Sequence, residues 1–338
     1  MSPTPSYPPA APAAPALPGA ALPDATRPDG PRPDAAQRHA DRYRGIWLPV
    51  VTPFQADGRV DHTALRALVT DAVLAGIAGF VACGSTGEAA MLATGSAPQL
   101  EDDEQAAVLG TVLAASGGRP VLMGLQGVVP AAVAARAQAL ADAHPGVAGW
   151  LLAPPPYVKP SQAGLIDFYT QVADASPRPI VAYDIPGRTG VRIEPATLLA
   201  LADHPRIEAV KDCSGDRAAA EAVLADGRLA WLGGNDDELF DQLARGAAGA
   251  IVASAHVATA GFVALHRAIE AGDLPAARAL WRRLCPLTRA LFAEPNPAPI
   301  KAVLAQQGRL TELLRAPMRP ASATTVRAAA AALRAVDG

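Results

Sequence analysis

Residues 179–212 read PIVAYDIPGRTGVRIEPATLLALADHPRIEAVKD, and two short apolar runs in this stretch decide the fold. The runs cover residues 179–185 and 207–211, and Gly or Pro lies close to their ends. Short apolar runs bounded in this way are typical of parallel strands that are buried on both faces. We therefore predict two parallel strands here.

Six further runs of the same kind flank this stretch. They cover residues 46–52, 79–84, 120–124, 149–154, 229–233 and 250–254. Amphipathic stretches that suit helices lie between them, among them 62–75, 102–115, 131–143 and 162–175. Asp61 and Ser161 are the expected N-caps of the first and the last of these four. Eight alternations in one unbroken series favour a closed (β/α)₈ TIM barrel over an open doubly wound sheet.

The chain is longer than a barrel needs, because it has 338 residues and a single (β/α)₈ barrel commonly takes about 250. Residues 1–43 are rich in Pro and Ala. Such a tract buries too little apolar surface to offset its ordering entropy, so we expect a disordered extension there. The barrel is expected over residues 44–272. Residues 273–338 are expected to form a C-terminal helical appendage, with helices over 273–292, 299–307 and 321–336.

Charge and composition exclude several classes of partner. The net charge is −3 and the sequence has no basic block, so neither nucleic acid nor a membrane is expected as a partner. No uninterrupted apolar run is long enough to cross a bilayer, and the first 40 residues do not resemble a secretory signal. Cys83, Cys213 and Cys285 are spaced too irregularly for a disulfide framework or a metal site. We expect a cytoplasmic protein.

Lysine is rare in this chain. Of the 29 Lys and Arg residues, only Lys159, Lys211 and Lys301 are lysines. Arg serves wherever a positive charge is enough, so a retained Lys suggests a need for an amine that can lose its proton. Chance retention is the alternative, and the bias does not single out one lysine.

Active sites of (β/α)₈ barrels lie at the C-terminal ends of the strands, and Lys211 ends the sixth predicted strand. Burial at the end of an apolar run lowers the pKa of a lysine, and a neutral amine can attack a ketone to form an imine. Alternatively, the lysine head extends along the core edge to solvent.

Other strand ends also carry polar groups, and each group has a functional and a purely structural explanation. Ser85 and Thr86, between Gly84 and Gly87, can hold a small carboxylate, or they belong to an ordinary glycine-rich turn. Tyr183 can relay protons to an imine, or it is a satisfied barrel tyrosine. Arg188 can clamp a carboxylate from a Pro/Gly loop, or it is a surface arginine. Packing is the simpler explanation for Tyr157, on the loop stiffened by prolines after the fourth strand.

Together these motifs resemble the dihydrodipicolinate synthase/N-acetylneuraminate lyase family, from about residue 45 onward. The residues that carry the resemblance are Val51-Thr52-Pro53-Phe54, Gly84-Ser85-Thr86-Gly87-Glu88, Tyr183, Ile185-Pro186, Lys211-Asp212, Gly233-Gly234-Asn235-Asp236 and Glu294-Pro295-Asn296-Pro297. The resemblance implies a (β/α)₈ barrel with C-terminal helices, assembled as a homotetramer of two tight dimers. It implies no metal and no organic cofactor.

The resemblance also implies roles for individual residues. Lys211 would form the imine with pyruvate, Tyr183 would shuttle protons, and Ser85 would complete the relay. Tyr157 matches a tyrosine that reaches across the tight dimer into the neighbouring site. The expected substrate-binding residues are Thr86, Gly87, Arg188 and Ile251.

Arg188 and Tyr157 are similar to the synthase branch of the family, which condenses pyruvate with a small aldehyde, aspartate 4-semialdehyde, in lysine biosynthesis. Ser85, His256 and the stretch Leu125-Gln126-Gly127 depart from the usual synthase pattern. So does the connection over residues 93–101, which is longer than usual.

The pocket through which lysine inhibits some synthases is expected to be absent, because its polar positions fall on Val128 and Ala132 and its aromatic position on Pro156.

Two other functions stay open at this stage. One is a pyruvate-dependent lyase of a 2-keto-3-deoxy sugar acid or a related hydroxy-keto acid, and Arg188 is the residue that argues against it. The other is a non-catalytic paralogue that binds a keto acid, and the joint presence of Lys211, Tyr183 and the turn at Ser85 argues against that.

Overall fold

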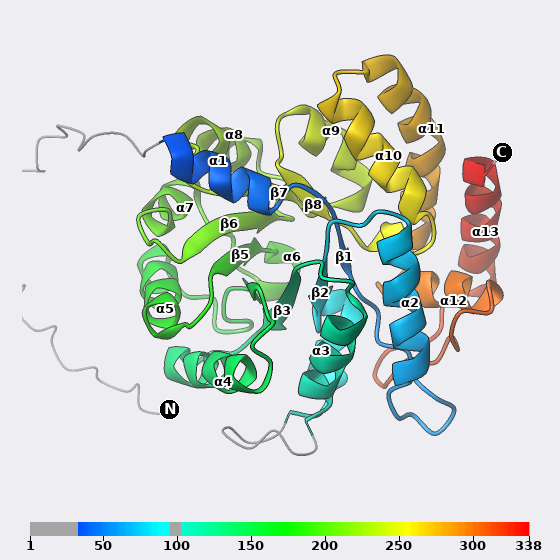
Figure 1. Ribbon diagram of the computed structural model, residues 1–338, viewed down its shortest axis with the longest axis horizontal. Coiled ribbons are helices and arrows are strands. Elements are labelled where there is room, and N and C mark those ends of the chain that lie inside the picture. The colour runs from blue at the N-terminus through cyan, green and yellow to red at the C-terminus, as the bar shows by residue number, and fades with distance from the viewer. Residues whose placement is uncertain (1–32, 95–102, 338) are drawn as a thin grey trace, which may run out of the picture.

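The computed structural model describes residues 33–94 and 103–337 as a closed barrel of eight parallel strands (Figure 1). Each strand pairs with the next along the chain, and β1 pairs with β8 to close the ring. The strands are β1 (Gly45–Pro49), β2 (Gly79–Ala82), β3 (Val121–Leu125), β4 (Gly149–Leu152), β5 (Ile180–Asp184), β6 (Ile207–Asp212), β7 (Ala230–Gly233) and β8 (Gly249–Ile251). The predicted TIM barrel and its strand order are confirmed.

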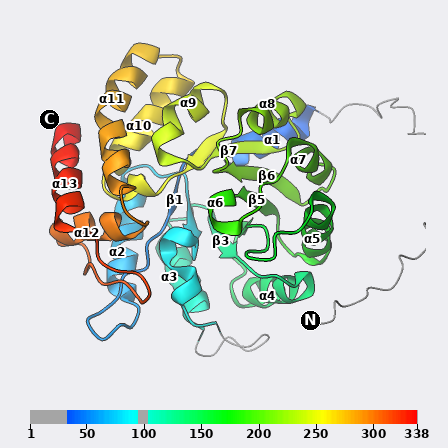
Figure 2. The ribbon, with the colours of Figure 1, turned by 180° about the vertical axis from the view of Figure 1, so that it is seen from behind.

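Helices surround the barrel on all sides (Figures 1 and 2). They are α2 (His62–Leu74), α3 (Glu104–Ala115), α4 (Pro130–Ala143), α5 (Gln162–Ala175), α7 (Pro195–Leu201), α8 (Arg217–Asp226), α9 (Leu239–Ala244) and α10 (Thr259–Glu270). Both predicted N-caps are confirmed: the Asp61 carboxylate accepts from backbone N–H groups of the first turn of α2, and the Ser161 hydroxyl does so in α5. None of the described helices has the length and apolar character that crossing a membrane requires.

Five short elements follow strands β2, β5, β7 and β8. They are the 3₁₀ turns η1 (Ser85–Gly87), η2 (Ala89–Met91), η3 (Asp236–Glu238) and η4 (Ala253–His256), and the helix α6 (Pro186–Thr189). The segment that carries Arg188, expected to be a loop, is therefore helical. Pro186 at the start suits a first helical turn, and Gly190 at φ 76° ends it in the left-handed conformation that glycine allows.

Alternation along each strand separates two cores. In β6, Ala209 packs with the side chains inside the barrel, whereas Val210 packs between the strands and the helices. Tyr183 also belongs to the interior cluster, and it pairs in register with Lys211 on the neighbouring strand. The register thus sets these two side chains next to each other at the C-terminal end of the barrel interior.

The C-terminal appendage consists of three helices, as expected. They are α11 (Leu274–Leu291), α12 (Ala298–Gln306) and α13 (Ala323–Asp337). A separate apolar cluster that includes Val51, Leu287, Ile300 and Ala329 joins them to the barrel near the end of β1. The segment between α11 and α12 thereby lies at the mouth of the barrel.

The last ten or so residues of the predicted N-terminal extension contain a helix. Residues 1–32 lie outside the described part of the chain, but Pro33–Arg42 form helix α1, so the prediction of disorder is wrong for this stretch. Ala, Gln and Arg favour a helix, and tertiary contacts hold it in place. The buried Tyr43 donates its hydroxyl to Glu208 at 2.9 Å, and Arg42 pairs with the same carboxylate. Composition alone does not reveal these contacts.

Candidate active site

A cavity of about 620 Å³ opens at the C-terminal ends of the strands. Six of the eight predicted site residues line it: Ser85, Thr86, Tyr183, Arg188, Lys211 and Ile251. They come from β5, β6, β8 and two of the short elements that follow strands. Gly87 and Tyr157 do not line it. The barrel therefore brings together side chains that lie up to 166 residues apart in the sequence, between Ser85 and Ile251.

Lys211 is buried, with 6% of its surface exposed, and its Nζ lies 4.3 Å from the centre of the Tyr183 ring. Within the described ranges its amine makes no hydrogen bond or ion pair. Burial lowers the pKa of Lys211 and outweighs the nearby Cys213 and Asp236, which raise it, while Arg188 lowers it further. The side chain does not extend to bulk solvent, which argues against the snorkelling alternative. The lowered pKa favours the neutral amine that attack on a ketone requires.

Tyr183 is equally buried, and burial raises the pKa of its phenol well above the ordinary value. The thiol of Cys213 raises this pKa as well, whereas the charge of Arg188 and a hydrogen bond with Ser85 lower it. The phenol therefore stays protonated, next to both the amine of Lys211 and the hydroxyl of Ser85. That position suits a group that passes protons between them.

The turn Ser85–Gly87 is held from two sides. Asn296 donates from Nδ2 to the Thr86 hydroxyl at 2.9 Å, and Thr52 donates to the Gly87 carbonyl at 2.7 Å. A Cβ at Gly87 would lie 2.9 Å from the Val50 carbonyl oxygen, so only glycine fits. Gly87 thus shapes the turn as backbone and leaves the cavity wall to its neighbours.

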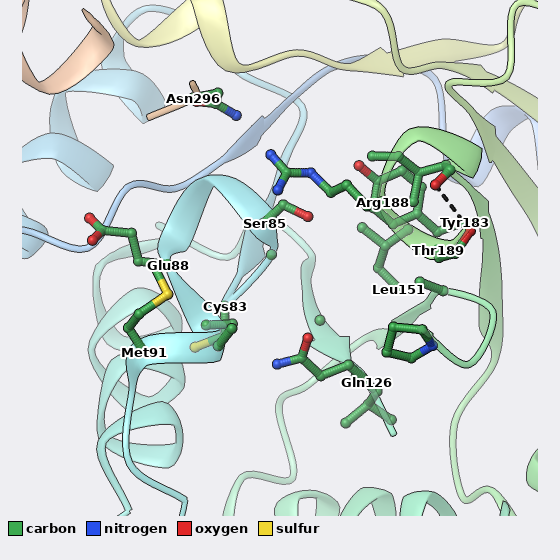
Figure 3. Close-up of a pocket in the computed structure, with 18 of the residues that line it drawn as sticks. Cys83, Ser85, Glu88, Met91, Gln126, Leu151, Tyr183, Arg188, Thr189 and Asn296 are labelled. Atoms are coloured by element: carbon green, nitrogen blue, oxygen red, sulfur yellow. Dashed lines mark hydrogen bonds between the residues drawn. The ribbon is translucent and has the colours of Figure 1, made fainter. Parts of the chain in front are cut away.

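Arg188 extends from α6 across the mouth of the cavity, and Figure 3 shows its guanidinium pointing toward Ser85 and Asn296. Thr189 fixes the short helix by donating its hydroxyl to the Ile185 carbonyl at 3.1 Å. A planar guanidinium at this position can bind a carboxylate through two parallel hydrogen bonds. At the other side of the barrel Ile251, only 1% exposed, forms part of the apolar floor.

Tyr157 lies apart from the other predicted residues. It is 92% exposed and its backbone has φ 73°, a left-handed conformation that is unfavourable for tyrosine. The packing explanation suggested by its loop is wrong within this chain, because the ring is not covered. Val128, Val129 and Val158 are exposed as well.

Asp236 and Cys213 also line the cavity, although neither is among the predicted site residues. Asp236 is 4% exposed, and its Oδ1 accepts from the Ser254 backbone N–H at 2.6 Å. Burial raises the pKa of Asp236 to about 6, and its charge in turn raises the pKa of Lys211. Asp236 follows β7 directly, so the strand-end rule applied there could have found it. Cys213, two residues after Lys211, lines the cavity too, and burial raises its pKa to about 11.

His256, one of the departures from the family pattern, connects two parts of the barrel mouth. The Val51 backbone N–H donates to Nε2 at 3.1 Å, so the imidazole proton must be on Nδ1, which lies 2.9 Å from the Ala253 carbonyl oxygen. Burial lowers the pKa of His256 to about 4. The ring is therefore neutral at physiological pH and joins the segment after β1 to η4.

A second, smaller cavity of about 290 Å³ adjoins the first (Figure 3). Ser85, Tyr183 and Arg188 line both cavities, whereas Met91 and Leu125 give the smaller one an apolar wall. Among residues 33–94 and 103–337, no group of three or more His, Cys, Asp or Glu side chains is arranged to hold a metal ion.

Known proteins resemble this chain over most of its length. A model of the dihydrodipicolinate synthetase family matches residues 42–336. A 4-hydroxy-tetrahydrodipicolinate synthase from an Exiguobacterium species is 37% identical over 285 residues, which cover 83% of this chain and 94% of that protein. The solved dihydrodipicolinate synthase of Thermotoga maritima is 29% identical with a TM-score of 0.81, and the match covers 88% of this chain and 99% of that chain. A monomeric dihydrodipicolinate synthase variant is 28% identical with a TM-score of 0.81, covering 88% and 98%.

Proposed function

Because the chain belongs to the dihydrodipicolinate synthetase family, we propose that it catalyses the 4-hydroxy-tetrahydrodipicolinate synthase reaction, the condensation of pyruvate with aspartate 4-semialdehyde. The observation that carries this proposal is the buried amine of Lys211 beside the phenol of Tyr183. The two lie in one cavity with a turn that suits a carboxylate and with the guanidinium of Arg188.

The first step is imine formation. The pyruvate carboxylate binds at the turn of Ser85 and Thr86, which sets the ketone carbon near Nζ of Lys211. The neutral amine adds to that carbon, and the resulting hydroxyl leaves as water after it receives a proton from Tyr183. The nitrogen gives one of its own protons to the ketone oxygen, so this step leaves a protonated imine and the phenolate of Tyr183. Ser85, hydrogen-bonded to that phenol, passes back to it the proton that the pyruvate methyl group loses in the next step.

The second step forms the carbon–carbon bond. Loss of a proton from the pyruvate methyl group gives an enamine, whose terminal carbon adds to the aldehyde carbon of the second substrate. Arg188 binds the carboxylate of that substrate and orients the aldehyde. The amino group of the same substrate then attacks the imine carbon, which closes the ring and frees Lys211.

We place the reaction in the cytoplasm and assign the protein a homotetrameric assembly built from tight dimers. Val128 and Val129 follow β3, and Tyr157 and Val158 follow β4, and all four side chains are exposed. A dimer contact would remove such apolar side chains from water. Across that contact, Tyr157 of the partner subunit would reach Ser85 and extend the relay. Because the chain is also similar to a monomeric variant, the oligomeric state has to be measured directly.

Subunit mixing tests the assembly. Tyr157→Phe and Lys211→Arg proteins are each expected to be nearly inactive, but mixed dimers contain one site with both Lys211 and Tyr157. Recovery of activity on mixing, together with a tetramer mass by light scattering, supports the assembly. A monomer mass with full activity would exclude it.

Borohydride trapping tests the function. Pyruvate and borohydride should leave a reduced adduct on Lys211, found by peptide mass spectrometry, and Lys211→Arg should leave none because guanidinium stays protonated. Turnover with aspartate 4-semialdehyde should then far exceed cleavage of 2-keto-3-deoxy sugar acids. The reverse ratio would make the protein a sugar-acid lyase, and no adduct would make it a non-catalytic binder.

A further inference from the structure

Lys301 is a second buried lysine, and the proposed mechanism does not use it. Its side chain is fully enclosed, and its Nζ lies 2.5 Å from Oε1 of Glu88, which is also enclosed. The same amine donates to the Leu313 carbonyl at 2.9 Å. Burial lowers the pKa of Lys301 to about 8 even though Glu88 raises it.

Glu88 directly follows the turn Ser85–Gly87. Its backbone is left-handed at φ 57°, and its N–H donates to the Ser85 carbonyl at 3.2 Å. A residue other than glycine is unfavourable in this conformation, so surrounding contacts have to maintain it. Figure 3 shows the Glu88 carboxylate turned away from Ser85. The side chain therefore affects the turn by holding the Glu88 backbone in place, and not by contacting a bound substrate.

The partners of Glu88 come from the C-terminal part of the chain. Lys301 belongs to α12, and the backbone N–H of Arg315 donates to the other carboxylate oxygen at 3.2 Å. Both cations lie over the ring of Phe54, at 4.2 Å for Lys301 and 4.6 Å for Arg315. Arg315 also binds Glu104, so the charges in the cluster balance.

We infer that the Glu88–Lys301 pair is a positioning device that fixes the turn Ser85–Gly87 in the conformation that binds the pyruvate carboxylate. The inference rests on the proposed function, which gives that turn its ligand. It assigns the C-terminal appendage a role in substrate affinity, since Lys301 and the backbone of Arg315 hold the carboxylate.

The experiment compares the wild type with Lys301→Met and with Glu88→Gln/Lys301→Met. The thermal midpoint is measured, together with the pyruvate concentration that half-saturates borohydride trapping on Lys211 and turnover at saturating pyruvate. For Lys301→Met we expect a lower midpoint, a half-saturating concentration raised about tenfold and turnover within about threefold of wild type. The double variant leaves no unpaired buried charge, so its midpoint should largely recover while the half-saturating concentration stays high.

Glu208→Gln is the matched control. It removes a partly buried ion pair, with Arg42, at the opposite end of the same barrel, so it should change the midpoint without changing pyruvate saturation. If the double variant has the same half-saturating pyruvate concentration as the wild type, the inference is overturned. The Glu88–Lys301 pair would then have a purely structural role. If the wild type itself forms no adduct, the proposed function fails and this inference fails with it.

Discussion

Lys211 and Lys301 are both buried, and burial lowers the pKa of both, but their surroundings differ. Lys301 pairs with a carboxylate at 2.5 Å in a closed contact between the barrel and α12. Lys211 lines an open cavity, has an aromatic ring as its close neighbour and has no ion-pair partner among the residues that the structure describes. Burial by itself therefore does not make a lysine reactive. The absence of a direct ion pair and access to a ligand are also needed.

The largest effect is expected where the unpaired lysine is changed. Lys211→Arg keeps the positive charge but cannot lose its proton, so kcat should fall at least about 10⁴-fold, which is about 5.5 kcal/mol of activation free energy. Steady-state turnover measures the loss, and circular dichroism should show an unchanged fold. Turnover within tenfold of wild type would show that the imine at Lys211 is not needed.

A large effect of a different kind is expected at the paired lysine. Lys301→Met leaves the Glu88 carboxylate buried without its cation, and such a break lowers the free energy of unfolding by about 3–5 kcal/mol. Denaturant titration measures it. Lys211→Met breaks no direct ion pair among the described residues, and burial already raises the pKa of the nearby Asp236 to about 6, so this variant should be destabilised much less. Equal losses in the two variants would remove the distinction.

Much of this contrast could not be predicted from the sequence. The apolar run that ends at Lys211 predicts a strand, and the barrel rule places its end at the active site, because both depend on local pattern and element order. Glu88 and Lys301 meet across 213 residues, and nothing in either local sequence indicates the partner. Likewise, the Pro/Ala composition before Tyr43 does not show that Glu208 fixes α1.

Asp184 offers the converse case, a buried carboxylate that forms no ion pair with the residues that the structure describes, although the charge of Arg192 lowers its pKa. Its Oδ2 has no hydrogen-bond partner in the described part of the chain, and burial raises the pKa of Asp184 to about 7, with the charge of Asp212 adding to the effect. Between pH 4 and pH 7 the folded protein therefore holds a proton that the unfolded chain has released, and stability falls as the pH rises through this window. We compare the free energy of unfolding of Asp184→Asn with that of the wild type at each pH. The difference should favour the variant by about 2 kcal/mol more at pH 8 than at pH 5.

Denaturant titrations of the wild type and of Asp184→Asn at both pH values measure this difference. The same substitution at Asp71, an exposed carboxylate, provides the control and should show a much smaller change with pH. If the Asp184 variant gains nothing at pH 8, its carboxylate is not a buried unpaired charge.

The smallest effect is expected from free lysine, which should not change the initial rate. Val128 and Ala132 offer no carboxylate or amide to bind free lysine, and Pro156 offers no aromatic ring. Lysine at millimolar concentration should therefore leave the initial rate unchanged. Half-maximal inhibition below 1 mM would show that a cation can be bound beside this site by other groups.

The position of helix α1 determines which end of the barrel faces the medium when the protein is immobilised through its N-terminal part. The helix contacts the N-terminal ends of the strands, through Glu208 at the start of β6 and through the Arg228 and Ala148 carbonyls just before β7 and β4. The chain therefore joins the barrel on the face opposite the cavity. A bead, carrier protein or electrode coupled ahead of Pro33 would leave the mouth of the barrel facing the medium, so immobilised protein should keep its substrate access.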